Sequence, residues 1–209
     1  MGVQLMNIAK YIAEQFGKPT GIGGIISTFI MNRMNQIQYK SVVINLNCSK
    51  KDRVLDIGFG NGYLINLLAK KNEGDFYGIE ISDDMLKAGC NRNSELIKQR
   101  KIHLTKGNVM DIPFEDSFFD KVYTVNTVYF WKDLDKSLSE IKRVLKPNGI
   151  FINSIYSKQF LDNIKYTQYG FLKYTPKELE AAILRNGLNV VQVVETKKNI
   201  SYCIISRKN

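Results

Sequence analysis

The sequence predicts an α/β fold in which helices cover both faces of a parallel sheet. From Asp52 onward, short runs rich in β-branched residues alternate with segments whose apolar residues recur every three or four positions. This alternation is typical of parallel strands that are joined by helices. We expect strands at residues 53–57, 75–79, 101–106, 120–125 and 149–154, and helices at residues 63–70, 83–99 and 134–145.

The C-terminal part predicts one more helix and a hairpin. Thr175, Pro176 and Glu178 have the spacing of a capped helix start, and Gly187 ends that helix. Two strands then follow at residues 188–195 and 200–207, joined by a short polar turn. Because a parallel crossover needs about a dozen residues, this last pair must be antiparallel.

The first 48 residues lie outside the alternation. Leu5, Ile8 and Ile12 follow helical spacing, and a second helical segment at about residues 26–46 leads into the core. The length of 209 residues suits a single domain. We therefore expect residues 1–48 to form a helical N-terminal cap or lid, not an independent domain, on a core of residues 49–209.

Composition and charge restrict the partners of the protein. The net charge of +10 suggests nucleic acid, but the lysines occur as scattered pairs at the ends of apolar runs, so we expect a solvated surface and no nucleic-acid partner. The longest apolar stretch, residues 22–31, is too short to cross a membrane, and no secretory pattern precedes it. We expect a cytoplasmic protein without integral membrane association. With three distant cysteines and a single histidine, no metal site is expected.

The strongest local signal is a glycine-rich turn after the first strand. Gly58, Gly60 and Gly62 alternate with Phe59 and Asn61 and lead directly into a helix. Glycines allow positive φ angles and let a ligand approach the backbone, and a helix start offers unpaired N–H groups to an anionic group.

Two acidic residues flank this turn. Asp56 precedes the glycines, and Glu80 stands at the end of the second strand. A carboxylate at the second position can accept hydrogen bonds from both ribose hydroxyls of an adenosine-bearing cofactor. The spacing is GxGxG, whereas dinucleotide-binding turns have GxGxxG, and Tyr63 occupies the place of the third dinucleotide glycine. A nicotinamide dehydrogenase is therefore a distant alternative.

The order of four motifs resembles the class I S-adenosylmethionine-dependent methyltransferases of the small-molecule type. The turn matches the family's DxGxGxG, and residues 78–82 are similar to its second motif. Residues 107–120 resemble the family's GDAxxLPFxDxSFD segment, and residues 140–149 resemble ExxRVLKPGG. The resemblance covers about residues 50–155. It implies a Rossmann-like, doubly wound sheet of seven strands in the order 3-2-1-4-5-7-6, with the last strand antiparallel.

The resemblance also implies how S-adenosyl-L-methionine is bound. Asp56 would order the turn and help to hold the methionine ammonium group, and Phe59 would narrow the mouth of the site. Glu80 would bind the ribose, and Ile81 would pack on the adenine. Asn108 stands where the family usually has Asp. The complete set of cofactor-binding residues implied in this way is Asp56, Gly58, Phe59, Gly60, Gly62, Glu80, Ile81, Asn108, Val109 and Asn126.

The acceptor site is less well marked. Methyl transfer from a sulfonium needs alignment of the acceptor more than acid–base groups, and His103 is expected to be a packed or surface residue. Residues 126–131 follow the fourth strand but lack the two prolines of amino-methylating nucleic-acid enzymes. Tyr129, Phe130 and Trp131 in this segment are equally consistent with core packing and with an acceptor pocket. The aromatic residues of the cap and of the insertion at 156–174 favour a small or lipid-like organic acceptor. The candidates for the acceptor pocket are Tyr129, Trp131, Tyr11 and Tyr174.

These observations favour methylation of a small organic acceptor by in-line transfer. Two alternatives stay open: an RNA or protein methyltransferase that uses the positive charge, and a protein that binds S-adenosylmethionine without turnover. The catalytic residues, the acceptor atom and the oligomeric state do not follow from the sequence.

Overall fold

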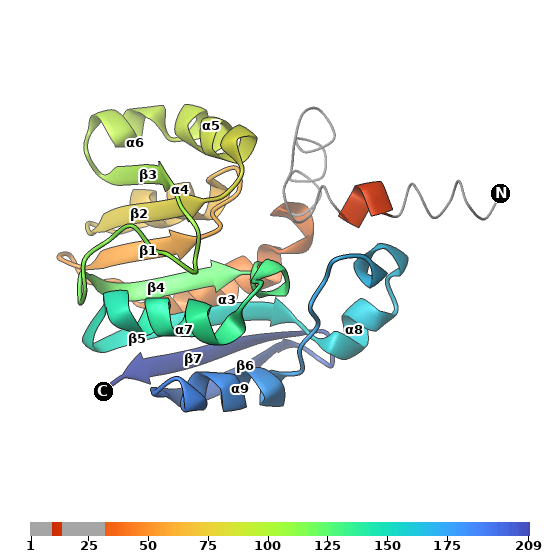
Figure 1. The fold of residues 1–209 in the computed structure, drawn as a ribbon. Coiled ribbons are helices and arrows are strands. Elements are labelled where there is room, and N and C mark those ends of the chain that lie inside the picture. Colours follow the sequence, from red (N-terminus) through yellow and green to blue (C-terminus); the bar gives the residue numbers. More distant parts are fainter. Residues whose placement is uncertain (1–9, 14–31) are drawn as a thin grey trace.

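The structure, a computed structural model, describes residues 10–13 and 32–209. Seven strands form a single sheet in the order β3-β2-β1-β4-β5-β7-β6 (Figure 1). Strands β1 to β5 pair in parallel, and β7 runs antiparallel to both β5 and β6. The predicted fold, strand order and antiparallel last strand are confirmed. The strands are β1 Arg53–Ile57, β2 Asp75–Glu80, β3 Ile102–Lys106, β4 Phe119–Val125, β5 Leu145–Tyr156, β6 Leu188–Lys197 and β7 Ser201–Lys208.

Helices cover both faces of the sheet. Figure 1 shows α7 and α9 on the near face, with α3 behind the sheet. The helices are α3 Gln36–Leu46, α4 Tyr63–Lys71, α5 Asp83–Arg92, α6 Ser94–Lys98, α7 Leu134–Val144, α8 Lys158–Asp162 and α9 Pro176–Arg185, with short 3₁₀ turns η1 Val128–Phe130 and η2 Lys165–Gln168. The fold thus has a central sheet between two helical layers, as parallel strands that are buried on both faces require.

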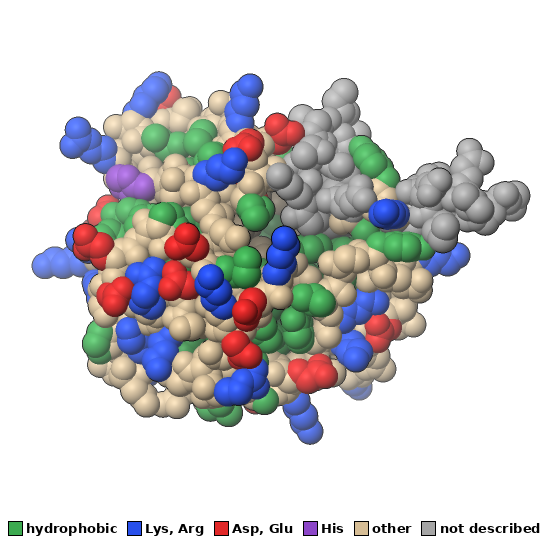
Figure 2. Space-filling view, in the orientation of Figure 1, with side chains coloured by type: hydrophobic (Ala, Val, Ile, Leu, Met, Phe, Trp, Pro, Cys, Tyr) green, Lys and Arg blue, Asp and Glu red, His purple; other side chains and the backbone are tan. Residues whose placement is uncertain are grey.

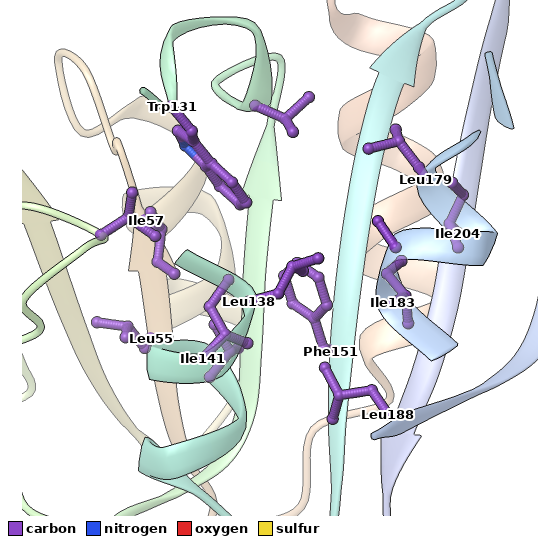
Figure 3. Packing of buried hydrophobic residues seen from close by; sticks show 14 of the residues in the cluster. Leu55, Ile57, Trp131, Leu138, Ile141, Phe151, Leu179, Ile183, Leu188 and Ile204 are labelled. Atoms are coloured by element: carbon purple, nitrogen blue, oxygen red, sulfur yellow. The ribbon is translucent and has the colours of Figure 1, made fainter. Parts of the chain in front are cut away.

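The larger part of the core lies between the sheet and the helices α7 and α9 (Figure 3). Leu138 and Ile141 of α7 are completely buried, because apolar residues recur along one face of this helix. They face Phe151 of β5, which is also completely buried. Burying a side chain of this kind stabilises the fold by about 1.5–3 kcal/mol.

On the other face of the sheet, α3 and α4 pack into a second cluster. Val42 and Leu46 of α3 lie with Leu68 of α4 against buried strand residues such as Val54 and Phe76. The end of the predicted N-terminal cap, α3, is therefore part of the layer that covers the sheet. Apart from residues 10–13, the chain before residue 32 lies outside the described residues, so the role of residues 1–48 as a lid stays a prediction.

Two predicted elements differ from the structure. The single helix expected at residues 83–99 is wrong, because Asn93 separates α5 from α6. The amide nitrogen of Asn93 donates to the carbonyl oxygens of Gly62 (3.2 Å) and Gly89 (2.8 Å), so this side chain ties the interruption to the glycine turn. Strand β5 begins at Leu145, earlier than expected, and its pairing with β4 has a register irregularity between Leu145 and Ile150.

The predicted helix starts are confirmed. Helix α5 begins at Asp83 as expected, and the Ser82 side chain caps it by accepting a hydrogen bond from the Met85 N–H (3.4 Å). Thr175 and Glu178 form the expected capping box of α9.

One buried amide has no partner among the described residues. Asn153 of β5 is 0% exposed, and neither its side-chain oxygen nor its nitrogen has a hydrogen bond. Burying an unpaired amide costs about 1–3 kcal/mol.

We expect Asn153→Val to raise the free energy of unfolding by about 1–2 kcal/mol in urea titrations, because valine suits a buried strand. Asn189→Val, at an exposed position of β6, should leave it nearly unchanged. A destabilised Asn153→Val protein would show that the amide is hydrogen-bonded.

Candidate functional site

The turn after β1 consists of glycines in a conformation that other residues rarely adopt. Gly58, Gly60 and Gly62 have φ angles of 71°, 57° and 70°. A Cβ atom at Gly58 would lie 2.6 Å from a side-chain carbon of Thr127, whereas at Gly60 it would meet nothing within 4 Å. The positive φ angle therefore accounts for glycine at residue 60, and the space above it is open to a ligand.

Glu80 fixes this turn to the end of the neighbouring strand. Its carboxylate accepts hydrogen bonds from the backbone N–H groups of Gly60 (2.9 Å), Ile81 (2.8 Å) and Ser82 (2.9 Å). The side chain is only 7% exposed. Burial raises the pKa of this carboxyl above its ordinary value, and the three backbone hydrogen bonds oppose the shift because they favour the charged form. The result is an acidic group held rigidly beside the turn.

Asp56 lies beneath the turn. It pairs in register with Tyr123 of β4, so the two side chains point to the same face of the sheet, and the Tyr123 hydroxyl donates to the Asp56 carboxylate (2.7 Å). Burial raises the pKa of Asp56 to about 8; the Tyr123 hydrogen bond lowers it, and the nearby charge of Glu80 raises it further. Asp56 therefore supports the glycine turn from below.

A cavity of about 250 Å³ opens where β1, β2 and β4 end. It is the position at which ligands bind in open α/β sheets. The structure brings eight of the ten predicted cofactor residues to its walls, together with Trp131, and Asp56 and Gly62 are not among its lining residues. The eight are Gly58, Phe59, Gly60, Glu80, Ile81, Asn108, Val109 and Asn126.

Two of these residues have surroundings that the sequence did not indicate. Phe59 is 7% exposed, and its ring lies so close to Gly78 and Gly89 that a Cβ atom at either position would come within 2.6 Å of it. The ring therefore packs beneath the turn and does not project across the mouth, contrary to expectation. The side-chain oxygen of Asn108 accepts a hydrogen bond from the Met110 N–H (3.0 Å), which fixes the orientation of its amide.

A cluster of amide side chains forms one wall of the cavity. Asn126, whose φ angle is 58°, exchanges two hydrogen bonds with the Gln38 amide (2.8 and 3.1 Å). It also donates to Asn35 (3.0 Å) and accepts from the Tyr129 hydroxyl (3.1 Å). The Tyr39 hydroxyl continues this wall, because it donates to the Asn32 oxygen (2.9 Å).

Sequence reasoning missed Asn32, Asn35, Gln38 and Tyr39. The sequence contains a pattern that could have indicated them. Asn32, Asn35 and Gln38 recur every three residues in an expected helix, and this spacing places polar side chains on one face of the helix.

A second, smaller cavity of about 50 Å³ adjoins the first, and Asn35, Asn126 and Phe130 line both. Among the described residues, its walls are mainly aromatic and aliphatic and carry no acidic or basic side chain. Of the predicted acceptor residues, Trp131 lines the larger cavity and Tyr129 the smaller one, whereas Tyr11 and Tyr174 line neither. The smaller cavity is lined by Met34, Asn35, Asn126, Tyr129, Phe130, Tyr156, Phe160, Leu161, Ile164, Tyr166, Thr167 and Phe171.

His103 lies away from both cavities. It is exposed in β3, and its ring stacks on Tyr77 with 4.7 Å between the ring centroids. It lines neither cavity.

Comparisons with known proteins identify the family. A family model described as a methyltransferase domain matches residues 55–153. The uncharacterized methyltransferase YdaC of Bacillus subtilis (strain 168) is 32% identical over 126 residues, 60% of this chain and 67% of that protein. A demethylmenaquinone methyltransferase of Symbiobacterium thermophilum is 37% identical over 175 residues, 79% of this chain and 65% of that protein.

A solved structure shares the fold. A SAM dependent methyltransferase from Aquifex aeolicus has a TM-score of 0.71 and 20% identity, and the match covers 85% of this chain and 93% of that one. The chain belongs to the class I S-adenosylmethionine-dependent methyltransferases. It is an enzyme of this family, and its cofactor is S-adenosyl-L-methionine. It spans about two thirds of the length of the two relatives.

The cavity fits this cofactor. The open space above Gly60 admits a ligand to the backbone, and Glu80 lines the same cavity with a carboxylate that can accept hydroxyl hydrogen bonds. Apolar side chains of Ile79, Ile81 and Met85 supply a surface for a flat ring.

Replacing Glu80 should weaken cofactor binding. In Glu80→Gln, the neutral amide cannot reproduce the charged acceptor, so we expect the Kd of S-adenosylhomocysteine to rise roughly 10- to 150-fold in calorimetry, equal to about 1.5–3 kcal/mol. Glu73→Gln, at an exposed acid that pairs with Lys50, is the matched control. An unchanged Kd for Glu80→Gln would remove Glu80 from the cofactor site.

The buried carboxyl of Asp56 should make stability depend on pH. Its pKa is raised from 3.8 to about 8, so the folded protein holds a proton that the unfolded chain releases, and the resulting stability is lost as pH rises from about 4 to about 8. Asp56→Asn stays neutral and lacks this loss. Without cofactor, the unfolding free energy of the variant minus that of the wild type should therefore rise by roughly 1.4 kcal/mol per pH unit in this window.

Urea titrations at about pH 5 and about pH 8 measure this difference. Asp111→Asn, at an exposed aspartate, is the matched control for the change of residue type. A flat difference for Asp56→Asn would mean that Asp56 is ionised in the folded protein throughout this range.

Proposed function

We propose that the chain transfers the methyl group of S-adenosyl-L-methionine to a small, largely apolar organic acceptor by in-line displacement. The observation that carries this proposal is the small aromatic cavity beside the larger one. The two share Asn35, Asn126 and Phe130, so an acceptor in the smaller cavity would border a cofactor in the larger one.

On the cofactor side, the roles follow from the family motifs. Glu80 would accept hydrogen bonds from the ribose hydroxyls, and Ile81 would pack on the adenine. The Asn108 side-chain oxygen would accept from the adenine amino group, and the Val109 backbone N–H would donate to the adenine ring. Asp56 holds the turn in place. Gly58 and Asn126 lie toward the methionine end, where backbone carbonyls attract its ammonium group. The bound cofactor supplies a methyl group that its sulfonium has already activated.

On the acceptor side, the protein supplies position and exclusion of water. Tyr129 and Phe171 stack with 5.8 Å between ring centroids, and Phe130 meets Phe171 edge-on at 4.7 Å. These packed rings form a rigid wall that can hold a flat acceptor in line with the reacting methyl group. Trp131 adds an aromatic face toward a positively charged sulfur.

The relatives and the surface also support a small acceptor. The relative from Symbiobacterium thermophilum is named a demethylmenaquinone methyltransferase, and this name supports a quinone-type small acceptor. Figure 2 shows Lys and Arg side chains scattered among Asp and Glu over this face, without one continuous basic patch of the kind that binds nucleic acid. Among the described residues, no helix is long and apolar enough to cross a membrane.

Methyl transfer from isotope-labelled cofactor tests the proposal. The protein is incubated with three acceptor panels: small quinols and phenols, transfer and ribosomal RNA, and proteins. We expect label in an extractable small molecule. Label only in RNA or protein would contradict the proposal, as would cofactor binding without transfer to any panel.

Filling the smaller cavity gives a second measurement. Ile164 lines this cavity, so Ile164→Trp should lower kcat/KM for the acceptor roughly 10-fold or more and leave the affinity for S-adenosylhomocysteine unchanged. Leu172→Trp is the control, because Leu172 is 46% exposed and lines neither cavity. An Ile164→Trp enzyme with full activity would exclude the smaller cavity as the acceptor site.

A further inference from the structure

Lys132 introduces a positive charge at the wall of the larger cavity. It directly follows Trp131, and both residues line this cavity. The side chain is exposed, as a group at the mouth would be. Among the described lining residues of both cavities, the acidic and basic side chains are Glu80 and Lys132. Glu80 is an acid that accepts three backbone hydrogen bonds, so Lys132 is the basic side chain among these described lining residues.

The carboxylates next to Lys132 in sequence are engaged elsewhere. Asp133 caps α7, where its side chain accepts from the Lys136 N–H (2.9 Å). Asp135 binds Arg185 (2.6 Å) and Asn186 (2.7 Å). Within residues 10–13 and 32–209, the ion pairs of the structure do not include Lys132. Its ammonium group is therefore available to an anionic ligand.

The surroundings of Lys132 favour an anion that is attached to an aromatic body. Phe130, two residues earlier, lines both cavities, so the larger cavity that Lys132 lines borders the smaller aromatic cavity at this ring. The amide side chains of Asn35 and Asn126 on the same wall are neutral and hydrogen-bonded. The net charge of +10 also attracts anions over a longer range.

We propose that Lys132 is the anion-binding part of the acceptor site, and that the acceptor is an aromatic compound with a carboxylate or similar oxyanion. This inference rests on the proposed function, because it assigns a charge to the acceptor of that reaction. The ammonium group would hold the anion at the mouth by a charge-assisted hydrogen bond, while the apolar body occupies the aromatic cavity. Lys132 thereby determines specificity and takes no part in bond making.

A matched pair of probes tests this role. 1-Hydroxy-2-naphthoate and 1-hydroxy-2-naphthamide have the same ring system and differ by one charge. Their Kd values are measured by calorimetry on the full chain saturated with S-adenosylhomocysteine. We expect the carboxylate to bind roughly 10-fold more tightly than the amide, a preference that added salt reduces.

Two variants assign the preference to one residue. Lys132→Gln should remove the preference for the carboxylate and leave the affinity for the amide unchanged. Lys136→Gln makes the same change of net charge on α7 at an exposed lysine that lines neither cavity, and it should keep the preference. The affinity for S-adenosylhomocysteine should be the same in all three proteins.

The opposite results separate this inference from the proposed function. Equal binding of both probes by the wild type, or no binding of either, overturns the role of Lys132. So does a Lys132→Gln protein that loses affinity for S-adenosylhomocysteine, because the lysine would then bind the cofactor carboxylate. If the labelled-cofactor panels still yield a methylated small molecule, the proposed function survives these outcomes; if they do not, it fails as well.

Discussion

The site depends on one side chain that joins two strands. The Glu80 carboxylate accepts N–H groups from the glycine turn that follows β1 and from the residues that follow β2. A buried carboxylate is costly without such partners, and a turn of three glycines in positive φ loses much conformational entropy on folding. The three N–H groups offset the cost of burying the carboxylate, and the hydrogen bond from Gly60 to the carboxylate stabilises the turn. Under the proposed binding mode, the side chain that would accept hydrogen bonds from the ribose therefore also holds the turn that lines the cavity.

The cluster of amide side chains that forms one wall of the larger cavity is held in place by hydrogen bonds between side chains. All four hydrogen-bonding positions of the Asn126 amide are occupied, by Asn35, Gln38 and Tyr129. A fully satisfied polar cluster is rigid and has one arrangement, because any rotation leaves a buried group unpaired. The boundary between the two cavities is therefore defined by polar contacts, whereas the outer wall of the smaller cavity is defined by the packing of aromatic rings.

Most of the fold could be predicted from the sequence because it is encoded locally. Strand β1 and the turn after it are read from a short apolar run and three glycines, and Thr175 and Glu178 mark the start of α9 within four residues. The break at Asn93 could not be predicted, because it depends on hydrogen bonds to Gly62, 31 residues away. The same limit applies to the amide wall, where Gln38 and Asn126 are 88 residues apart. The side on which Phe59 packs was likewise undetermined, since it depends on glycines in β2 and α5.

The position of Phe59 links three sites that are distant along the chain. Its ring fills the space that side chains at Gly78 and Gly89 would otherwise take. A side chain at either glycine would collide with this ring, and one at residue 78 would also lie 2.8 Å from Leu104. Among homologous sequences, side-chain size at these positions should vary in a compensating manner, because a chain that gains a side chain at 78 and retains phenylalanine at 59 would have to displace its own glycine turn.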